Sequence, residues 1–180
     1  YIGLLCMGST AFEDIEEYRN NLTFKHLLGI KVVPSAETLR QRLDELALLP
    51  EVFEILLEMN LLLIREVVLK ETAVTGMNLI VLDMDASPMD NSGSSKEKVS
   101  NTYKNFMGYC PVFAYISENG YMLNCNLRPG RDHSMEGAVE FINKCLEITD
   151  RLEITDRILF RLDSGYDAAD LIETINDRCY

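Results

Sequence analysis

The 180-residue sequence has few of the residues that build disulfide scaffolds and zinc sites. Its five cysteines are odd in number and widely spaced, with no C-x-x-C pair. This spacing argues against both kinds of site and is typical of reduced, packed thiols in a cytosolic protein. The two histidines, His26 and His133, lie far apart and match no metal-binding pattern. We therefore expect both of them to be surface or loop residues.

Long hydrophobic runs and basic charge are also lacking. Charged residues interrupt the most apolar predicted helix, Val52–Lys70, at Glu54, Glu58, Arg65 and Glu66. No run therefore approaches the roughly 18 residues that a membrane span requires, and no signal peptide is visible. The formal net charge is −12. Because a phosphate backbone is usually bound by a basic face, this acidity alone favours a metabolic enzyme or an interaction module over a DNA-binding protein.

Residues 1–75 have the pattern of a helical region. Four helices are predicted in it: Ala11–Arg19, Thr23–Leu28, a third from Ala36 to Ala47, and a fourth from Pro50 to about Glu71. Ser35 is a typical N-cap for the third helix, and Pro50 suits the first position of the fourth. Arg40 and Arg42 admit a helix-turn-helix interpretation. Because acidic residues balance these arginines, an amphipathic helix that packs on its neighbours is the preferred interpretation.

Residues 76–180 have the pattern of a mixed α/β domain. The predicted order is a strand over Asn78–Asp83, a loop over Pro88–Ser95, strands over Val112–Ser117 and Tyr121–Leu127, a helix over Met135–Ile148, a strand over Ile158–Asp163, and a helix from about Ala168 to Asp177. The second and third strands flank Asn119-Gly120, which is a strong signal for a β-hairpin. The first and last strands can lie parallel and adjacent through a crossover connection.

A short repeat precedes the last predicted strand. Leu146–Arg151 and Leu152–Arg157 are the same hexapeptide, Leu-Glu-Ile-Thr-Asp-Arg. Six residues rotate a helix by about 240°, so the two copies cannot present the same helix face. We interpret the repeat as a small duplication that lengthens the connection between helix and strand, since it is too short for a repeat architecture.

Two of the predicted strands end in aspartate. Asp83 and Asp85 are two residues apart and point to the same face of the first strand, and Asp163 ends the last strand. A parallel crossover would place Asp85 near Asp163, and two such carboxylates form half of an acidic site for a hard divalent cation. The structural alternative is that each aspartate caps a turn at its strand end.

Two classes of enzyme use this arrangement. The first is the haloacid-dehalogenase-like phosphatases, in which Asp83 would be the nucleophile and Asp85 the acid, with Asp163 and Asp167 in the later metal motif. The match is partial, because that fold requires parallel strands and the Asn119-Gly120 hairpin follows the first strand. The second class is the RNase H-like nucleases and transposases, in which the first strand leads into antiparallel partners and a later parallel strand carries the second acid.

Five ordered motifs favour the second class. They are Val33–Leu43, Leu82–Ser87, Thr102–Pro111, Leu127–Gly130 and Phe160–Tyr166. Together, over roughly residues 10–170, they resemble the DDE transposases of bacterial insertion sequences that have an RNase H-like catalytic domain. The resemblance implies an α/β fold: a partial RNase H-like domain over residues 76–180, with a mixed sheet, an antiparallel hairpin and a parallel strand, preceded by the helical region 1–75.

The resemblance also implies roles for individual residues. Asp85, followed by Ala86-Ser87, and Asp163 match the first two catalytic acids, and Asp83 is a further candidate metal ligand. These residues would hold Mg²⁺ (or Mn²⁺) for phosphodiester hydrolysis and strand transfer. The family's third acid is a glutamate that is expected beyond Tyr180, so the chain alone is expected to be inactive.

The implied partners are DNA, as transposon ends and target, in the full-length protein. A homodimer is allowed and no membrane is involved. The implied location is the bacterial cytoplasm, in association with the nucleoid. A truncated transposase remnant that serves as a non-catalytic interaction module is the remaining alternative.

Overall fold

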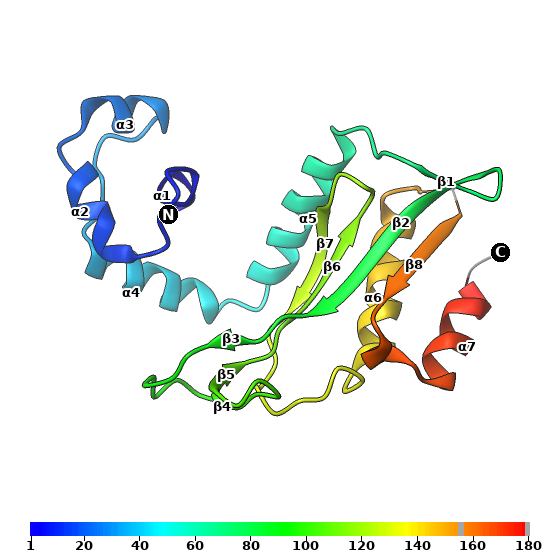
Figure 1. The fold of residues 1–180 in the computed structure, drawn as a ribbon. Helices are drawn as coiled ribbons and strands as arrows, with labels where there is room; N and C mark the ends of the chain where they lie inside the picture. The colour runs from blue at the N-terminus through cyan, green and yellow to red at the C-terminus, as the bar shows by residue number, and fades with distance from the viewer. Residues whose placement is uncertain (155–156, 179–180) are drawn as a thin grey trace. The chain divides into compact units, whose positions relative to one another are not determined.

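The computed structural model describes residues 1–154 and 157–178, and the chain divides into two compact units, residues 1–59 and 60–180 (Figure 1). The division falls within helix α5 (Val52–Arg65). The boundary that we predicted between residues 75 and 76 lies in the turn between strands β1 (Thr72–Val74) and β2 (Met77–Ala86), which pair with each other antiparallel. No helix in the described residues is long and apolar enough to cross a membrane.

The first unit consists of short helices. They are α1 (Ile2–Cys6), the 3₁₀ turn η1 (Phe12–Asp14), α2 (Ile15–Tyr18), α3 (Leu22–Leu27), α4 (Ala36–Ala47) and the first residues of α5. The helix predicted over residues 11–19 is therefore divided between η1 and α2. The helix predicted over residues 23–28 is confirmed to within one residue, and Asn21 caps it by accepting a hydrogen bond from the Phe24 amide at 2.9 Å.

A small apolar cluster holds these helices together. Its buried members are Leu4, Ile15, Phe24, Val33 and Ala36. The ring of Tyr18 stacks on that of Phe24, with 4.7 Å between the ring centroids. Each fully buried large aliphatic or aromatic side chain contributes about 1.5–3 kcal/mol relative to its exposed state, so this cluster is the main source of stability for a unit of such short helices.

Helix α4 begins where the sequence predicted. Ser35 accepts a hydrogen bond from the Thr38 amide at 3.2 Å, which confirms the predicted cap. The Ala36 amide, another of the unpaired N–H groups of the first turn, donates to the Glu16 carboxylate at 2.8 Å. Glu16 therefore joins α2 to the start of α4. This hydrogen bond first, and the neighbouring Arg19 second, lower the pKa of Glu16 below its ordinary value.

The lowered pKa predicts an acid-sensitive contribution of Glu16 to stability. A depressed carboxyl pKa stabilises the fold above the ordinary pKa of glutamate, and this contribution is lost as the pH falls through the lowered value. Glu16→Gln should therefore speed hydrogen exchange of the first-turn α4 amides at neutral pH. The difference from the wild type should shrink when the pH falls below the ordinary glutamate range. Glu17→Gln is the matched control, and an equal effect of both substitutions would contradict the assignment.

The second unit is built on a five-stranded sheet. Besides β1 and β2 it contains β6 (Val112–Ile116), β7 (Tyr121–Asn126) and β8 (Ile158–Leu162). β2 is the central strand, with β6 antiparallel on one side and β8 parallel on the other. β7 pairs antiparallel with β6 through the turn that contains Gly120, whose φ is 71°. The predicted hairpin is confirmed, and Gly120 adopts the positive φ that glycine allows in such a turn.

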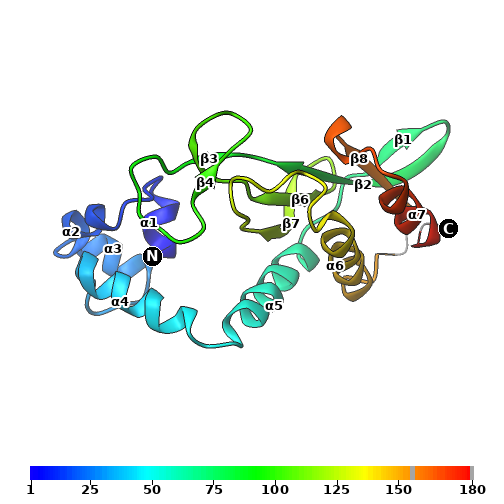
Figure 2. The same cartoon turned by 90° about the horizontal axis from the view of Figure 1, so that it is seen from below.

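Helix α6 (Ala138–Arg151) lies on one side of this sheet, beneath it in the view of Figure 2, and packs on β7 and on α7 (Ala169–Arg178). Its apolar face is fully buried at Ile142, Cys145 and Ile148. Gly137 precedes the helix with a φ of 67°, which glycine adopts without strain. The central strand alternates near its end: Met84 and Ala86 are buried, whereas Asp85 is exposed.

Two predictions about the boundaries were wrong. The helix that was expected to reach Glu71 ends at Arg65. The chain then runs extended beside the β6–β7 turn, where the Lys70 amide donates to the Ser117 hydroxyl at 2.6 Å and that hydroxyl donates to the Lys70 carbonyl at 3.0 Å. These long-range hydrogen bonds replace the helical ones. Helical periodicity alone cannot detect this competition.

The expected loop over Pro88–Ser95 contains a strand, β3 (Met89–Asp90). It forms a second, small sheet with β5 (Met107–Tyr109) and β4 (Ser100–Asn101). Strands of two or three residues have too few positions to show alternation, so no sequence pattern indicated them. Gly130 packs tightly on this sheet: a Cβ there would lie 2.4 Å from the Ser100 carbonyl oxygen.

Candidate active site

The two aspartate-ended strands lie side by side. β2 and β8 pair in parallel, with Asp83 opposite Arg161 and Met84 opposite Leu162. Asp163 follows with extended backbone (φ −78°, ψ 172°), so continuing the register by one residue aligns it with Asp85. Strand residues that are directly opposite each other share a face of the sheet. The register therefore puts Asp85 and Asp163 on one face, at the carboxyl ends of both strands.

Each of these two carboxylates accepts one backbone hydrogen bond at its own strand end. Asp85 Oδ1 accepts from the Ala86 amide at 2.8 Å, and Asp163 Oδ1 accepts from the Gly165 amide at 2.9 Å. Asp163 thereby caps the 3₁₀ turn η2 (Ser164–Tyr166). The turn-capping alternative thus holds for Asp163, but the cap uses only Oδ1 of the two carboxylate oxygens. Within the described residues, Oδ2 of each carboxylate makes no hydrogen bond of its own.

Two tyrosines respond to the charge of this acid pair. Burial raises the pKa of Tyr166 to about 12, Arg128 opposes this rise, and the charges of Asp85 and Asp163 add to it. The pKa of Tyr103 is raised by desolvation first, then by Cys110 and by the same two aspartates. Both carboxylates therefore act on the same two hydroxyls, which places the acids in one electrostatic neighbourhood.

An open cleft of about 750 Å³ adjoins the acid pair. It lies at the strand ends, between Ala86 at the end of β2 and Asp163 after β8, and is also lined by the β4–β5 turn and the segment 130–134. The polar and charged side chains on its walls are Asn101, Thr102, Tyr103, Asn105, Arg131, Asp132, His133, Ser134, Asp163 and Ser164. The Tyr103 ring is 65 % exposed, so it presents a flat apolar surface at this cleft.

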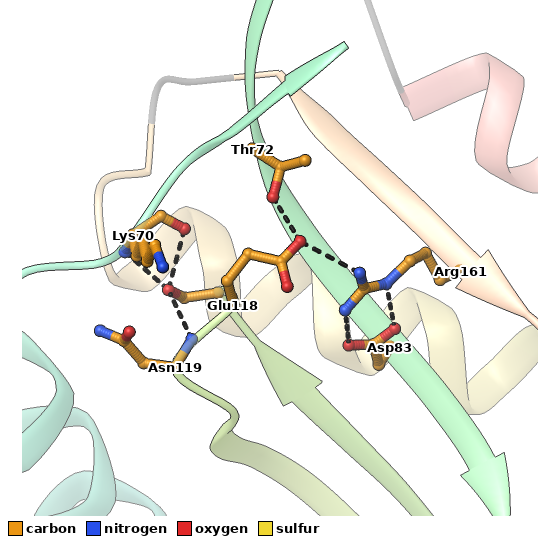
Figure 3. Close-up of polar contacts among 7 residues, drawn as sticks. Lys70, Thr72, Asp83, Glu118, Asn119 and Arg161 are labelled. Carbon is orange, nitrogen blue, oxygen red and sulfur yellow. Dashed lines mark hydrogen bonds and ion pairs between the residues drawn. The ribbon is translucent and has the colours of Figure 1, made fainter.

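Asp83 makes different contacts from Asp85. Both of its oxygens accept hydrogen bonds at 2.6 Å from Arg161, its register partner on β8. Figure 3 shows the Arg161 guanidinium between the carboxylates of Asp83 and Glu118. Glu118 lies 3.0 Å from Arg161 and also accepts a hydrogen bond from the Thr72 hydroxyl. The carboxylates raise the pKa of Arg161, with the hydrogen bonds to Asp83 contributing most.

The residues of the acid pair suit a hard cation. Carboxylate oxygens are the ligands that Mg²⁺ prefers, and Mg²⁺ is usually held by one or two carboxylates together with water and substrate phosphates. Asp85 and Asp163 satisfy this pattern. Among residues 1–154 and 157–178, no three His, Cys, Asp or Glu side chains gather as a metal site. Asp83 is not brought to the pair as a third ligand, since Arg161 engages both of its oxygens.

Sequence reasoning missed Arg161 and the buried role of Arg128. Arg161 lies two residues before Asp163, the same spacing as between Asp83 and Asp85, so a parallel register would have pointed to an ion pair between them. Arg128 belongs to one of the ordered motifs, and it is 6 % exposed. No sequence signal indicates that an arginine is buried, because arginine is rarely so.

The chain matches the family described as Transposase DDE domain group 1 over residues 2–179. This match covers nearly the whole sequence, so the protein belongs to the family of DDE transposases. The predicted family is therefore confirmed. No curated protein and no solved structure matches the chain.

The contacts of Arg161 predict an energetic coupling across β2 and β8. Both side chains of the pair are partly exposed, at 46 % for Arg161 and 34 % for Asp83, so we expect about 1 kcal/mol of coupling rather than a buried-pair value. A double-mutant cycle with Arg161→Met and Asp83→Asn, followed by urea denaturation, measures it. The pair Lys144–Glu147, at 3.3 Å on the surface of α6, is the control and should couple by less than half as much. Equal coupling energies for the two pairs would contradict the proposal that Arg161 links β2 to β8 more strongly than an ordinary surface ion pair.

Proposed function

We propose that this protein is the part of a DDE transposase that carries the first two catalytic acids, Asp85 and Asp163, on an RNase H-like sheet. The observation that carries the proposal is the parallel register of β2 and β8, which aligns these two carboxylates. The family match supports the class of protein, and the register supports the choice of residues.

The strand order supports the RNase H-like assignment. The strands run in the order β7-β6-β2-β8, with two antiparallel pairs followed by one parallel pair, and α6 forms the crossover between β7 and β8. The first strand therefore leads into an antiparallel hairpin, and the later parallel strand carries the second acid. The antiparallel neighbour β6 argues against the haloacid-dehalogenase-like alternative, whose sheet requires parallel strands.

The proposed chemistry is cleavage and transfer of a phosphodiester. Asp85 and Asp163 would hold the divalent cations, which would supply Lewis-acid stabilisation of the phosphoryl oxygens and a more acidic water or 3′-hydroxyl. The two carboxylates orient that site from fixed strand ends. Arg131 and His133, on the wall of the adjoining cleft, are donors that can bind a phosphate oxygen of DNA. The family's third acid is a glutamate, and we assign it to no residue of this chain.

Asp83 has a structural role in this proposal. Arg161 neutralises it and joins β2 to β8 at the register that aligns Asp85 with Asp163. Asp85 therefore ranks ahead of Asp83 as the first metal ligand. We propose DNA as the partner although the chain has a formal net charge of −12; divalent cations held by Asp85 and Asp163 would offset part of the negative charge at the site.

The assignment of the acids is tested by replacing each one with its neutral isostere. Asp85→Asn and Asp163→Asn should each lower the affinity of the chain for Mn²⁺ by about tenfold or more, because each removes one of two charged ligands. Titration calorimetry measures this affinity. Asp90→Asn is the matched control, since the contacts of Asp90 are local: it accepts a hydrogen bond from the amide of Ser92, two residues on, at 2.7 Å.

The same residues have an expected effect on DNA. In the full-length protein, Asp85→Ala or Asp163→Ala should abolish strand cleavage of the transposon ends, measured on labelled DNA. Cleavage that survives both substitutions would contradict the assignment of Asp85 and Asp163 as catalytic acids. Turnover of a generic phosphomonoester that depends on Asp83 would instead favour the phosphatase alternative. Wild-type protein that cleaves neither substrate would favour the non-catalytic remnant.

A further inference from the structure

Arg128 is a buried cation that organises the segment beside the acid pair. Its Nε donates to the Cys110 carbonyl at 3.1 Å. Its Nη1 contacts three carbonyls in the turn before α6: His133 and Ser134 at 3.3 Å and Glu136 at 2.8 Å. All four acceptors are backbone oxygens. Arg128 therefore holds the segment 133–136, part of which lines the cleft, through main-chain carbonyls and not through side chains.

Two polar atoms in this region are buried without a hydrogen-bond partner in the described residues. They are Nη2 of Arg128 and the hydroxyl of Tyr166. The two side chains are only 6 % and 2 % exposed. A buried donor without a partner costs the full free energy of its desolvation, so such atoms in a folded protein usually serve a bound water or a ligand.

A chain of contacts connects these atoms to the acids. Ser134, whose carbonyl binds Arg128, packs against the turn after Asp163: a Cβ on Gly165 would lie 3.1 Å from Ser134 Oγ. Tyr166 ends that same turn. Burial has the largest effect on the pKa of the Tyr166 hydroxyl; Arg128 then lowers this pKa, and Asp85 and Asp163 raise it. The buried Tyr166 hydroxyl thus keeps its proton, and it lies within the electrostatic influence of one buried cation and two carboxylates.

We propose that Arg128 and Tyr166 are positioning residues for the acid pair. Nη2 of Arg128 and the hydroxyl of Tyr166 donate to one buried water, and that water donates its two hydrogens to the carboxylates of Asp85 and Asp163. Such a water has four partners, which is a complete set for a structural water. This water restrains the two carboxylates and leaves one oxygen of each free to bind a cation. This inference rests on the proposed function of the two acids.

The decisive variant is Tyr166→Phe, which removes the hydroxyl and keeps the ring. In the metal-free chain, the backbone amides of Ala86 and Gly165 report on the two carboxylates, because each donates to one of them. We expect both amide resonances to shift in ¹H–¹⁵N spectra. We also expect the affinity for Mn²⁺ to fall by about tenfold, as is usual when a residue that orients a metal ligand is removed.

Tyr109→Phe is the matched control. Its hydroxyl donates to the Glu97 carbonyl at 2.7 Å, away from the acids, so its loss should leave both amide resonances and the Mn²⁺ affinity unchanged. Arg128→Lys is a second variant, which keeps the charge but removes the fork of donors. It should reproduce the amide shifts if the chain still folds. If Arg128→Lys does not fold, the Tyr166→Phe variant still decides the test.

The outcomes separate this inference from the proposed function. Unmoved Ala86 and Gly165 amides in Tyr166→Phe overturn the inference, whatever the metal affinity. Shifted amides with an unchanged Mn²⁺ affinity also overturn it, because the hydroxyl would then be structural only. A wild-type chain without Mn²⁺ affinity contradicts the metal site itself. In that case the amide shifts alone decide whether Arg128 and Tyr166 hold the carboxylates.

Discussion

The parallel pairing of β2 with β8 is the constraint on which the candidate site depends. A shift of one residue in this pairing would turn Asp163 to the opposite face from Asp85, since side chains alternate along a strand. Arg161 opposes such a shift, because a shift of one residue would move it out of register with Asp83, to which it donates two hydrogen bonds. This arginine–carboxylate ion pair thus favours the register that aligns two other carboxylates.

Near the strand ends, backbone carbonyls accept the hydrogen bonds of a buried arginine, Arg128. Arg128 binds four of them and draws the segment 133–136 towards the Cys110 carbonyl, while Gly130 allows the main chain to approach the small sheet closely. The cleft beside Asp163 is built on this arrangement. A charge that is this deeply buried is expensive without partners, so the local fold and the position of Arg128 depend on each other.

The parts of the fold that could be predicted from the sequence are those with strong local signals. The Ser35 cap, the Asn119-Gly120 hairpin and the two strands that carry Asp83, Asp85 and Asp163 all rest on short-range chemistry and were found. The strand β3 and the end of α5 were not found. In both places the chain pairs with residues that are distant in the sequence: Asp90 with Gly108 in one case, Lys70 with Ser117 in the other.

The repeated hexapeptide shows where this limit lies. Its first copy, Leu146–Arg151, is the helical end of α6, whereas Leu152–Ile154 of the second copy form the turn that follows, with φ of Glu153 at 58°; Thr155 and Asp156 lie outside the described residues. The same three residues, Leu-Glu-Ile, thus adopt two conformations: Ile148 of the first copy is fully buried in α6, whereas Leu152–Ile154 follow the last turn of that helix. The sequence by itself determined the family and the strands and proposed the acids, all of which depend on local pattern. Only the tertiary structure decided the register that aligns Asp85 with Asp163, the pairing of Asp83 with Arg161 and the burial of Arg128, since each depends on contacts between segments far apart in the chain.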